Sequence, residues 1–303
     1  MSQPCALCPR ECGADRSRER GFCGGGPLPR VARAALHRWE EPCLSGSDPA
    51  RGAGTVFFSG CPLKCAFCQN YPVSHENFGR EVPVSRLAEI FLELQEAGAW
   101  NLDLVTGTQY VPQIVEALDL VRGKLAVPVV WNSGGYEKPE TLRLLEGYVD
   151  IYLPDLKFYD PALAADCAHA PDYFPVAMAA IAEMYRQAGP LRLDEKGMLR
   201  RGLMVRHLVL PGERKDSEQL LRRLAKVIPV ENFSLSLMSQ YTPFRPMARK
   251  ALNRRVATFE YEWVRSVALE LGFSGFGQDR TSAREEYTPP FDLTGVERKE
   301  GAP

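Results

Sequence analysis

The stretch Gly54–Cys68, GTVFFSGCPLKCAFC, determines how the rest of the chain is interpreted. An apolar, β-rich run is followed by three cysteines within eight residues, Cys61, Cys65 and Cys68. Four thiolates close a zinc site or saturate a [4Fe–4S] cluster, whereas three thiolates on a four-iron cluster leave one iron open to another ligand. Gly60, just before the triplet, allows close backbone approach. The alternative is a zinc site completed by Cys43 or His75, although zinc sites usually have two C-x2-C pairs.

Short β-rich runs alternate with segments of helical periodicity from Gly54 onward, which predicts six βα units and a parallel sheet. Strands are expected at residues 54–59, 101–107, 127–133, 150–156, 203–211 and 233–240. Helices are expected at residues 86–98 with Ser85 as N-cap, 113–123 opened by Pro112, 172–189, 217–227 and 254–272. Such units form an incomplete barrel or a doubly wound sheet, and we expect an incomplete (β/α)6 TIM-like barrel.

In either fold the ligand site lies at the carboxyl ends of the strands. The cysteine triplet follows the first strand, and polar residues follow the next three: Thr106 with Gly107 and Thr108, then Asn132, then Asp155 and Lys157. Asp155 could also be a turn former and Lys157 a solvated lysine. Arg206, in the apolar fifth strand, must find a partner if it points inward, and His207 beside it is structural or faces solvent.

Composition excludes some classes of function. The chain has 303 residues, 37 Lys and Arg against 38 Asp and Glu, and no segregated charge blocks, so nothing indicates nucleic acid or a membrane surface. It also lacks an apolar run long enough for a membrane span or a signal peptide, and we expect a cytoplasmic protein. Thiols stay reduced there, so closely spaced cysteines indicate metal binding or catalysis.

A second cysteine group lies near the N-terminus, Cys5, Cys8, Cys12 and Cys23. Residues 1–50 are rich in Cys, Gly, Pro and Arg and are predicted to form a metal-binding lobe with a connection to the barrel. Zinc and a second [4Fe–4S] cluster both suit four thiolates. The arginines between these cysteines are expected to keep the lobe soluble. Residues 51–272 would form the partial barrel and 273–303 a C-terminal strap or tail.

Together, the C-x3-C-x2-C triplet after a first strand, the βα repeats and Phe67 before the last cysteine resemble the radical S-adenosylmethionine (SAM) superfamily. The resemblance implies that the open iron binds the amino and carboxylate groups of SAM. It also implies reductive cleavage of SAM to methionine and a 5′-deoxyadenosyl radical, which abstracts hydrogen from a substrate.

Further motifs, YLPDLKFYD, MVRHLVLPG and LSLMSQYTP, look like those of a branch similar to pyruvate formate-lyase activating enzyme. That resemblance implies that Asp155 and Lys157 lie near SAM and that Arg206 meets its carboxylate. Thr106-Gly107-Thr108 replaces Gly-Gly-Glu of these enzymes, and Asn132 replaces an aspartate at a small cation site. The expected cofactor-binding residues are Phe67, Thr106, Gly107, Thr108, Asn132, Asp155, Lys157 and Arg206.

The branch resemblance implies an oxidoreductase-type activating enzyme that generates a glycyl radical in a partner protein, with flavodoxin or ferredoxin as electron donor. Two alternatives remain at the level of sequence. One is radical SAM modification of a small molecule or another macromolecule. The other is a non-catalytic iron–sulfur electron-transfer protein, which would need no open iron.

Overall fold

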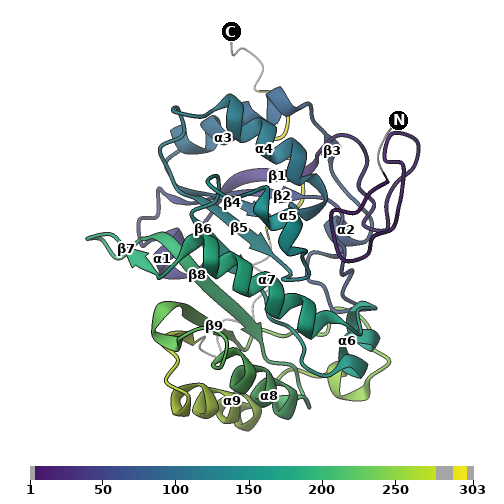
Figure 1. The fold of residues 1–303 in the computed structure, drawn as a ribbon, viewed down its shortest axis with the longest axis vertical. Helices are drawn as coiled ribbons and strands as arrows, with labels where there is room; N and C mark the ends of the chain where they lie inside the picture. The colour runs from purple at the N-terminus through teal and green to yellow at the C-terminus, as the bar shows by residue number, and fades with distance from the viewer. Residues whose placement is uncertain (1–3, 278–288, 299–303) are drawn as a thin grey trace.

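Six parallel strands lie side by side in the order in which they occur along the chain (Figure 1). The computed structural model describes residues 4–277 and 289–298. The strands are β2 (Gly52–Phe58), β4 (Ala99–Val105), β5 (Val129–Ser133), β6 (Ile151–Pro154), β8 (Leu199–Leu208) and β9 (Ser234–Met238). A doubly wound sheet would reverse its strand order at a switch point, whereas consecutive order is that of a barrel. The predicted fold class, an α/β incomplete barrel, is confirmed, and all six predicted strands are present.

Four further strands were not predicted. β1 (Arg30–His37) pairs antiparallel with β2, β3 (Arg80–Glu81) extends that edge, and β10 (Gly275–Gly277) adds a short parallel strand beside β9. β7 (Arg192–Leu193) forms a hairpin with β8. β1 thus lies within residues 1–50, in the segment expected to connect the metal-binding lobe to the barrel. Within residues 4–277 and 289–298, β3 and β10 end the sheet without pairing with each other, so the barrel is open.

Helices cover the outer face of the sheet between successive strands (Figure 1). The longer ones are α3 (Val84–Glu96), α4 (Val111–Leu120), α7 (Tyr173–Ala188), α8 (Arg214–Leu224) and α9 (Thr258–Glu270). The shorter ones are α1 (Pro42–Ser45), α2 (Tyr71–Ser74), α5 (Pro139–Arg143) and α6 (Pro161–Ala168), with 3-10 turns at Thr108–Tyr110, Val230–Asn232 and Lys250–Asn253.

Helix boundaries test the capping predictions. α7 lies between Asp172 and Gly189, as predicted. The Ser85 N-cap is wrong, because α3 already begins at Val84. α9 begins four residues later than predicted, since the Glu260 side chain accepts the backbone N–H of Ala257 (2.9 Å) and fixes the start of the helix there.

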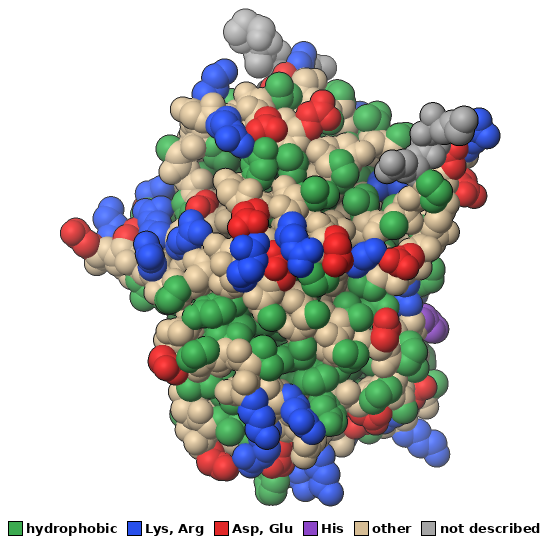
Figure 2. Space-filling view, viewed as in Figure 1, with side chains coloured by type: hydrophobic (Ala, Val, Ile, Leu, Met, Phe, Trp, Pro, Cys, Tyr) green, Lys and Arg blue, Asp and Glu red, His purple; other side chains and the backbone are tan. Residues whose placement is uncertain are grey.

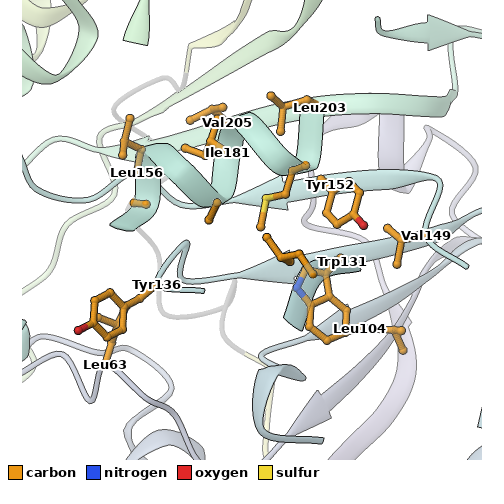
Figure 3. Close-up of a cluster of buried hydrophobic side chains, with 14 of the residues drawn as sticks. Leu63, Leu104, Trp131, Tyr136, Val149, Tyr152, Leu156, Ile181, Leu203 and Val205 are labelled. Atoms are coloured by element: carbon orange, nitrogen blue, oxygen red, sulfur yellow. The ribbon is translucent and has the colours of Figure 1, made fainter. Parts of the chain in front are cut away.

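The two faces of the strands bury different sets of side chains, as the two-residue period of a strand requires. On the outer face Trp131, Leu203 and Val205 pack with the helices, among them Ile181 of α7 (Figure 3). On the inner face a separate cluster packs around α1, which closes the barrel near the amino ends of its strands; its members are Cys43, Leu44, Val130, Ile151, Leu153, Leu199 and Met204. Full burial of such an aliphatic side chain contributes about 1.5–3 kcal/mol.

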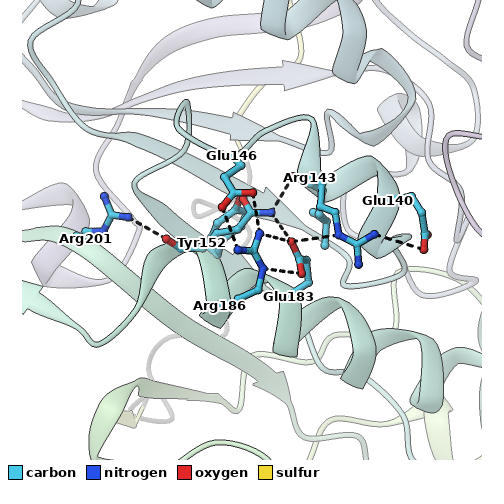
Figure 4. A network of polar contacts seen from close by, with 9 residues as sticks. Glu140, Arg143, Glu146, Tyr152, Glu183, Arg186 and Arg201 are labelled. Carbon is cyan, nitrogen blue, oxygen red and sulfur yellow. Dashed lines mark hydrogen bonds and ion pairs between the residues drawn. The ribbon is translucent and has the colours of Figure 1, made fainter.

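Surface charges are mixed and mutually paired. On the face shown in Figure 2, basic and acidic side chains are interspersed. A network between α5 and α7 centres on Arg186, which binds Glu146 and Glu183 (Figure 4). Arg186 is half exposed, so these pairs contribute little to stability. Among the described residues, no helix is both long and apolar enough to cross a membrane.

Residues 289–298 run along β1. The backbone N–H of Ala34 donates to Thr294 (2.8 Å), and Leu293 donates to Ala32 (3.1 Å). The buried Arg86 of α3 holds the carbonyls of Gly295, Val296 and Glu297. The rest of the expected C-terminal strap, at 278–288 and 299–303, lies outside the described residues.

Candidate active site

A cavity of about 230 Å³ opens at the carboxyl ends of the parallel strands. Its lining brings together residues that are far apart in the sequence, such as Cys61 and Arg206. Nine of the eleven residues predicted for the catalytic cluster and SAM contribute to it: Cys61, Cys65, Phe67, Cys68, Thr106, Asn132, Asp155, Lys157 and Arg206. Gly107 and Thr108 do not line it.

The cysteine loop is folded tightly by its backbone. Gly60 and Lys64 both adopt left-handed conformations, with φ of +89° and +47°. The N–H of Cys68 donates to the carbonyl of Cys65 (3.0 Å), and the N–H of Leu63 points at the sulfur of Cys61 (3.4 Å). These turns place all three thiols on one wall of the cavity.

The three buried thiols, once deprotonated, favour binding of a positively charged metal group. Burial raises the pKa of Cys61, Cys65 and Cys68, and neighbouring thiols raise the pKa of Cys61 and Cys65 further. The ammonium of Lys157 opposes this effect at each of the three. Three thiolates crowded in a buried wall need more positive charge than one lysine supplies, and iron in a cluster would supply it. The donor set therefore fits a three-cysteine [4Fe–4S] site.

The zinc alternative loses its expected fourth ligands. Both ring nitrogens of His75 are engaged within the protein, with Ser74 (2.8 Å) and with the carbonyl of Lys64 (3.0 Å). Cys43 lies in the apolar cluster around α1, near the opposite end of the barrel. Among the described residues, no three or more His, Cys, Asp or Glu side chains, the three catalytic cysteines included, are grouped so as to hold a single metal ion. A single zinc ion therefore does not fit the triplet, and the three thiolates fit a four-iron cluster instead.

Asp155 and Lys157 form a partly buried ion pair at the end of β6. The Lys157 ammonium lies 2.5 Å from the Asp155 carboxylate. Burial alone would lower the pKa of Lys157, but the charges of Asp155 and Cys65 outweigh it and raise the pKa. The Tyr173 hydroxyl oxygen lies within hydrogen-bond distance of the carbonyls of Gly134 (2.9 Å) and Asp155 (2.8 Å), which share its single hydrogen, and it accepts the N–H of Lys157 (3.0 Å). Lys157 is thus held by Asp155 and is not a freely solvated lysine.

Arg206 lines the cavity, but its guanidinium already binds two carboxylates. It contacts Glu41, with one bond of 2.8 Å, and Glu40, both from the segment after β1. Burial opposes ionisation of Glu41, yet Arg206 lowers its pKa below the ordinary value. Burial and the charge of Glu40 raise the pKa of nearby Asp103 well above its usual range. A charged cluster therefore forms part of the cavity wall. The Arg206 guanidinium is engaged with the carboxylates of this cluster.

The three residues after β4, Thr106, Gly107 and Thr108, have different roles. Thr106 lines the cavity with φ of +59°, which is unusual for a β-branched residue. Thr108 instead turns its hydroxyl to Glu137 (2.5 Å), whose carboxylate also accepts Trp131 and Ser133. A side chain at Gly107 would collide with Trp131, so Gly107 permits packing of the loop.

Replacement of Thr106 by glycine should separate stability from SAM binding. Glycine relieves the left-handed strain of about 1–2 kcal/mol but adds backbone entropy cost of about 0.5–1 kcal/mol, so stability should stay equal or rise slightly. If the Thr106 hydroxyl bonds SAM, as the resemblance implies, its loss should weaken binding by about 0.5–1.5 kcal/mol. Urea unfolding and equilibrium dialysis of SAM measure the two effects. Thr106→Ser is the control that keeps the hydroxyl; unchanged SAM affinity in Thr106→Gly would remove Thr106 from the site.

Two more predicted residues are placed by their neighbours. Phe67 packs edge-on against Phe158 and Tyr241, with ring centroids 6.0 and 5.6 Å away. Asn132 donates to Asp103 (3.3 Å). The other oxygen of Asp103 is buried and has no hydrogen-bond partner among the described residues. Asn132 therefore links the cavity to the charged cluster around Arg206.

Sequence reasoning missed the residues that position the site. Gln109 donates its amide to the carbonyls of Ser59 (3.0 Å), Gly60 (3.1 Å) and Thr106 (2.9 Å), joining the first two strand ends. Glu40 and Glu137 were missed as well. Their roles depend on contacts with residues distant in sequence or on support of a neighbouring side chain, which local patterns do not show. Gln109 alone could have been suspected, as a polar residue shortly after a strand.

His207 is buried, which decides between its two expected roles in favour of the structural one. Its ring nitrogens contact the carbonyl of Leu156 (2.6 Å) and the Ser217 hydroxyl (2.8 Å). Burial lowers the pKa of His207 to about 4; the Leu156 carbonyl and Asp155 oppose this shift, and Lys157 adds to it.

The depressed pKa of His207 predicts acid sensitivity. Below its ordinary pKa of 6.5 the unfolded chain binds a proton that the folded chain refuses until about pH 4. The unfolding free energy should thus fall as the pH drops through this window, by about 2–3 kcal/mol from this residue. Urea titrations at pH 7 and pH 4.5 should show a smaller loss for His207→Gln than for wild type. Equal losses would contradict the assignment.

The N-terminal cysteines gather beside the catalytic loop. Cys8 and Cys23 are buried and Cys12 is exposed. The sulfurs of Cys12 and Cys23 both lie within 4 Å of the position that a side-chain carbon on Gly21 would take. The expectation that the arginines only keep the lobe soluble is wrong for Arg10, which binds the carbonyls of Pro62 (2.8 Å) and Ala168 (2.7 Å).

Comparison with known proteins identifies the superfamily. The Radical SAM superfamily model matches residues 55–224, more than half of the chain, and the chain therefore belongs to the radical SAM superfamily. Membership implies a [4Fe–4S] cluster and SAM, and the protein is a radical SAM enzyme.

The individual relatives do not show to which branch of the radical SAM superfamily the chain belongs. The uncharacterized protein MJ0674 of Methanocaldococcus jannaschii is 29% identical over 88% of this chain and 73% of its own. A radical SAM methyltransferase from Sphaerobacter thermophilus shares the fold with a TM-score of 0.52 at 15% identity, over 77% of this chain and 67% of that chain. Streptococcus suis SuiB bound to S-adenosylmethionine gives a TM-score of 0.48 at 13% identity, over 75% and 50%.

Proposed function

We propose that Cys61, Cys65 and Cys68 hold the catalytic [4Fe–4S] cluster and that SAM binds against it in the cavity. A reduced cluster held by these thiolates would supply the electron for cleavage of SAM to methionine and a 5′-deoxyadenosyl radical. The observation that carries the proposal is the convergence of the triplet with Thr106 and the Asp155–Lys157 pair in one cavity. Phe67 and Asn132 complete the proposed SAM-binding lining.

Arg206 enters this proposal in a different role from the expected one. Glu40 and Glu41 already bind the Arg206 guanidinium. We therefore assign Arg206 chiefly to positioning these two carboxylates, and not to binding the carboxylate of SAM by itself. Gly107 and Thr108 likewise act by shaping the loop that presents Thr106. The direct contacts to SAM then fall chiefly on Thr106, Asn132 and Lys157.

For the substrate, we propose a polypeptide from which the radical takes a hydrogen atom, with glycyl radical formation as the specific case implied by the branch resemblance. The supporting observation is the open sheet, because β3 and β10 leave a lateral gap in pairing among the described residues. An open barrel can admit a loop of another protein, whereas a closed one favours small substrates. A small-molecule substrate is the competing outcome.

The source of the hydrogen atom tests this proposal. Extract from cells grown on α-deuterated glycine is separated by ultrafiltration and each fraction is supplied to the reduced enzyme with SAM. Deuterium in 5′-deoxyadenosine from the macromolecular fraction, lost after protease treatment, supports the polypeptide substrate. Deuterium only from the small-molecule fraction would overturn it. Cys65→Ala controls for unrelated enzymes in the extract.

We also propose that Cys5, Cys8, Cys12 and Cys23 bind a metal. The four cysteines lie in one loop-rich lobe, with two of them buried, and such a lobe gains folding energy from a metal. Zinc and a second [4Fe–4S] cluster both suit the thiolates. Elemental analysis of the purified protein, compared with Cys5→Ser, distinguishes the two, and absence of both metals would contradict the proposal.

A further inference from the structure

The lobe that carries the N-terminal cysteines is joined directly to the catalytic cysteine loop. The N–H of Cys61 donates to the carbonyl of Cys23 at 3.2 Å. A side chain at Gly60 would collide with that same carbonyl oxygen, so the contact depends on glycine at this position. One residue of each proposed cluster site therefore shares a backbone hydrogen bond with the other.

Several independent contacts hold this junction. Asn77 donates its side-chain amide to the carbonyl of Gly24 (2.9 Å), next to Cys23. On the other side Arg10 reaches Pro62, inside the catalytic loop, at 2.8 Å. Arg16 binds the carbonyl of Gln109, the residue whose amide joins the two strand ends. The arrangement fixes the lobe against the site, beyond what a solubilising appendage needs.

The four N-terminal cysteines differ in solvent exposure, so that the set has one side facing solvent and one side facing the catalytic loop. Cys12 is exposed to solvent, whereas Cys23 has only 6% of its surface exposed and lies against the catalytic loop. The catalytic thiols, in contrast, lie on the wall of a cavity that SAM is proposed to fill. With SAM and substrate bound, a large donor protein would reach the surface of the lobe more easily than the catalytic cluster.

We propose that Cys5, Cys8, Cys12 and Cys23 bind a second [4Fe–4S] cluster that relays electrons from a protein donor to the catalytic cluster. The electron enters on the Cys12 side and leaves through Cys23, along the backbone to Cys61. One electron leaves the reduced donor, a flavodoxin or ferredoxin, and one arrives at the catalytic site. No atom is transferred, and the relay site returns to its starting oxidation state. This inference rests on the proposed catalytic cluster.

Metal content provides the first test. In a Cys61→Ala, Cys65→Ala, Cys68→Ala triple variant reconstituted with iron and sulfide, about four irons per chain should remain, compared with about eight in wild type. Mössbauer and electron paramagnetic resonance spectra should show that they form one cluster. Zinc, or no metal, at the N-terminal set in the triple variant would overturn the relay.

Reduction kinetics provide the second test, and they do not require SAM. Wild type, Cys12→Ser and the control Cys43→Ala, which removes a thiol outside both sets, are mixed with reduced flavodoxin or with dithionite. The catalytic cluster is followed by freeze-quench electron paramagnetic resonance. The relay predicts that flavodoxin reduces it about tenfold or more slowly in Cys12→Ser, whereas dithionite, a small reductant, is affected far less.

The outcomes separate the relay from its alternatives. Equal slowing with both reductants in Cys12→Ser would indicate a structural role and overturn the relay, as would an unchanged flavodoxin rate. If wild type takes up the catalytic cluster and is reduced but forms no 5′-deoxyadenosine, the proposed enzymatic function fails while the relay test still stands. Cys5→Ser serves as the second variant if Cys12→Ser does not fold.

Discussion

Replacement of Arg206 by methionine is expected to lower the free energy of unfolding by about 3–5 kcal/mol, since it leaves buried carboxylates unpaired. Arg206 has 12% of its side chain exposed, and its partners Glu40 and Glu41 have 10% and 8%. Removal of one partner from such a cluster strands charge in the barrel interior. Urea unfolding measures the effect.

The matched control is Arg265→Met, which removes an arginine that is 54% exposed and paired with Glu262. An exposed pair contributes about 0–1 kcal/mol, so this variant should stay near wild type. Adding Glu40→Gln and Glu41→Gln to Arg206→Met should recover part of the loss, because the stranded charges are removed. Equal stabilities of Arg206→Met and Arg265→Met would show that the charged cluster does not support the fold.

The second large effect concerns the catalytic thiols. Cys65→Ala is expected to prevent stable assembly of the catalytic cluster, because two thiolates cannot hold three of its corners. Iron and sulfide analysis after anaerobic reconstitution should show about four fewer irons per chain than in wild type. Cys43→Ala, which removes a buried thiol from the apolar cluster around α1, should retain the wild-type iron content. Equal iron in Cys65→Ala and wild type would move the cluster elsewhere.

Local sequence signals predicted the parallel strands and their consequence for the site. Six apolar runs correspond to β2, β4, β5, β6, β8 and β9. Because parallel strands end at one edge, residues after different strands could be expected to meet, and Thr106, Asn132 and Asp155 do line one cavity. The helix predicted at residues 172–189, which corresponds to α7, rested on equally local signals.

Long-range contacts could not be predicted in this way. β1 carries no clear alternation, and it joins the sheet through antiparallel pairing with β2. Glu40 and Glu41 meet Arg206 across 165 or more residues, so only the need of a buried arginine for a partner was foreseeable. The same applies to Arg10, which connects the N-terminal lobe to Pro62 and Ala168.

The direct test of the central claim is formation of 5′-deoxyadenosine. The protein is reconstituted anaerobically with iron and sulfide, reduced with dithionite and supplied with SAM, and the products are separated by chromatography. The account predicts 5′-deoxyadenosine from wild type and Cys43→Ala and none from Cys65→Ala. A fully loaded, reduced cluster whose electron paramagnetic resonance signal SAM leaves unperturbed, with no 5′-deoxyadenosine, would contradict it.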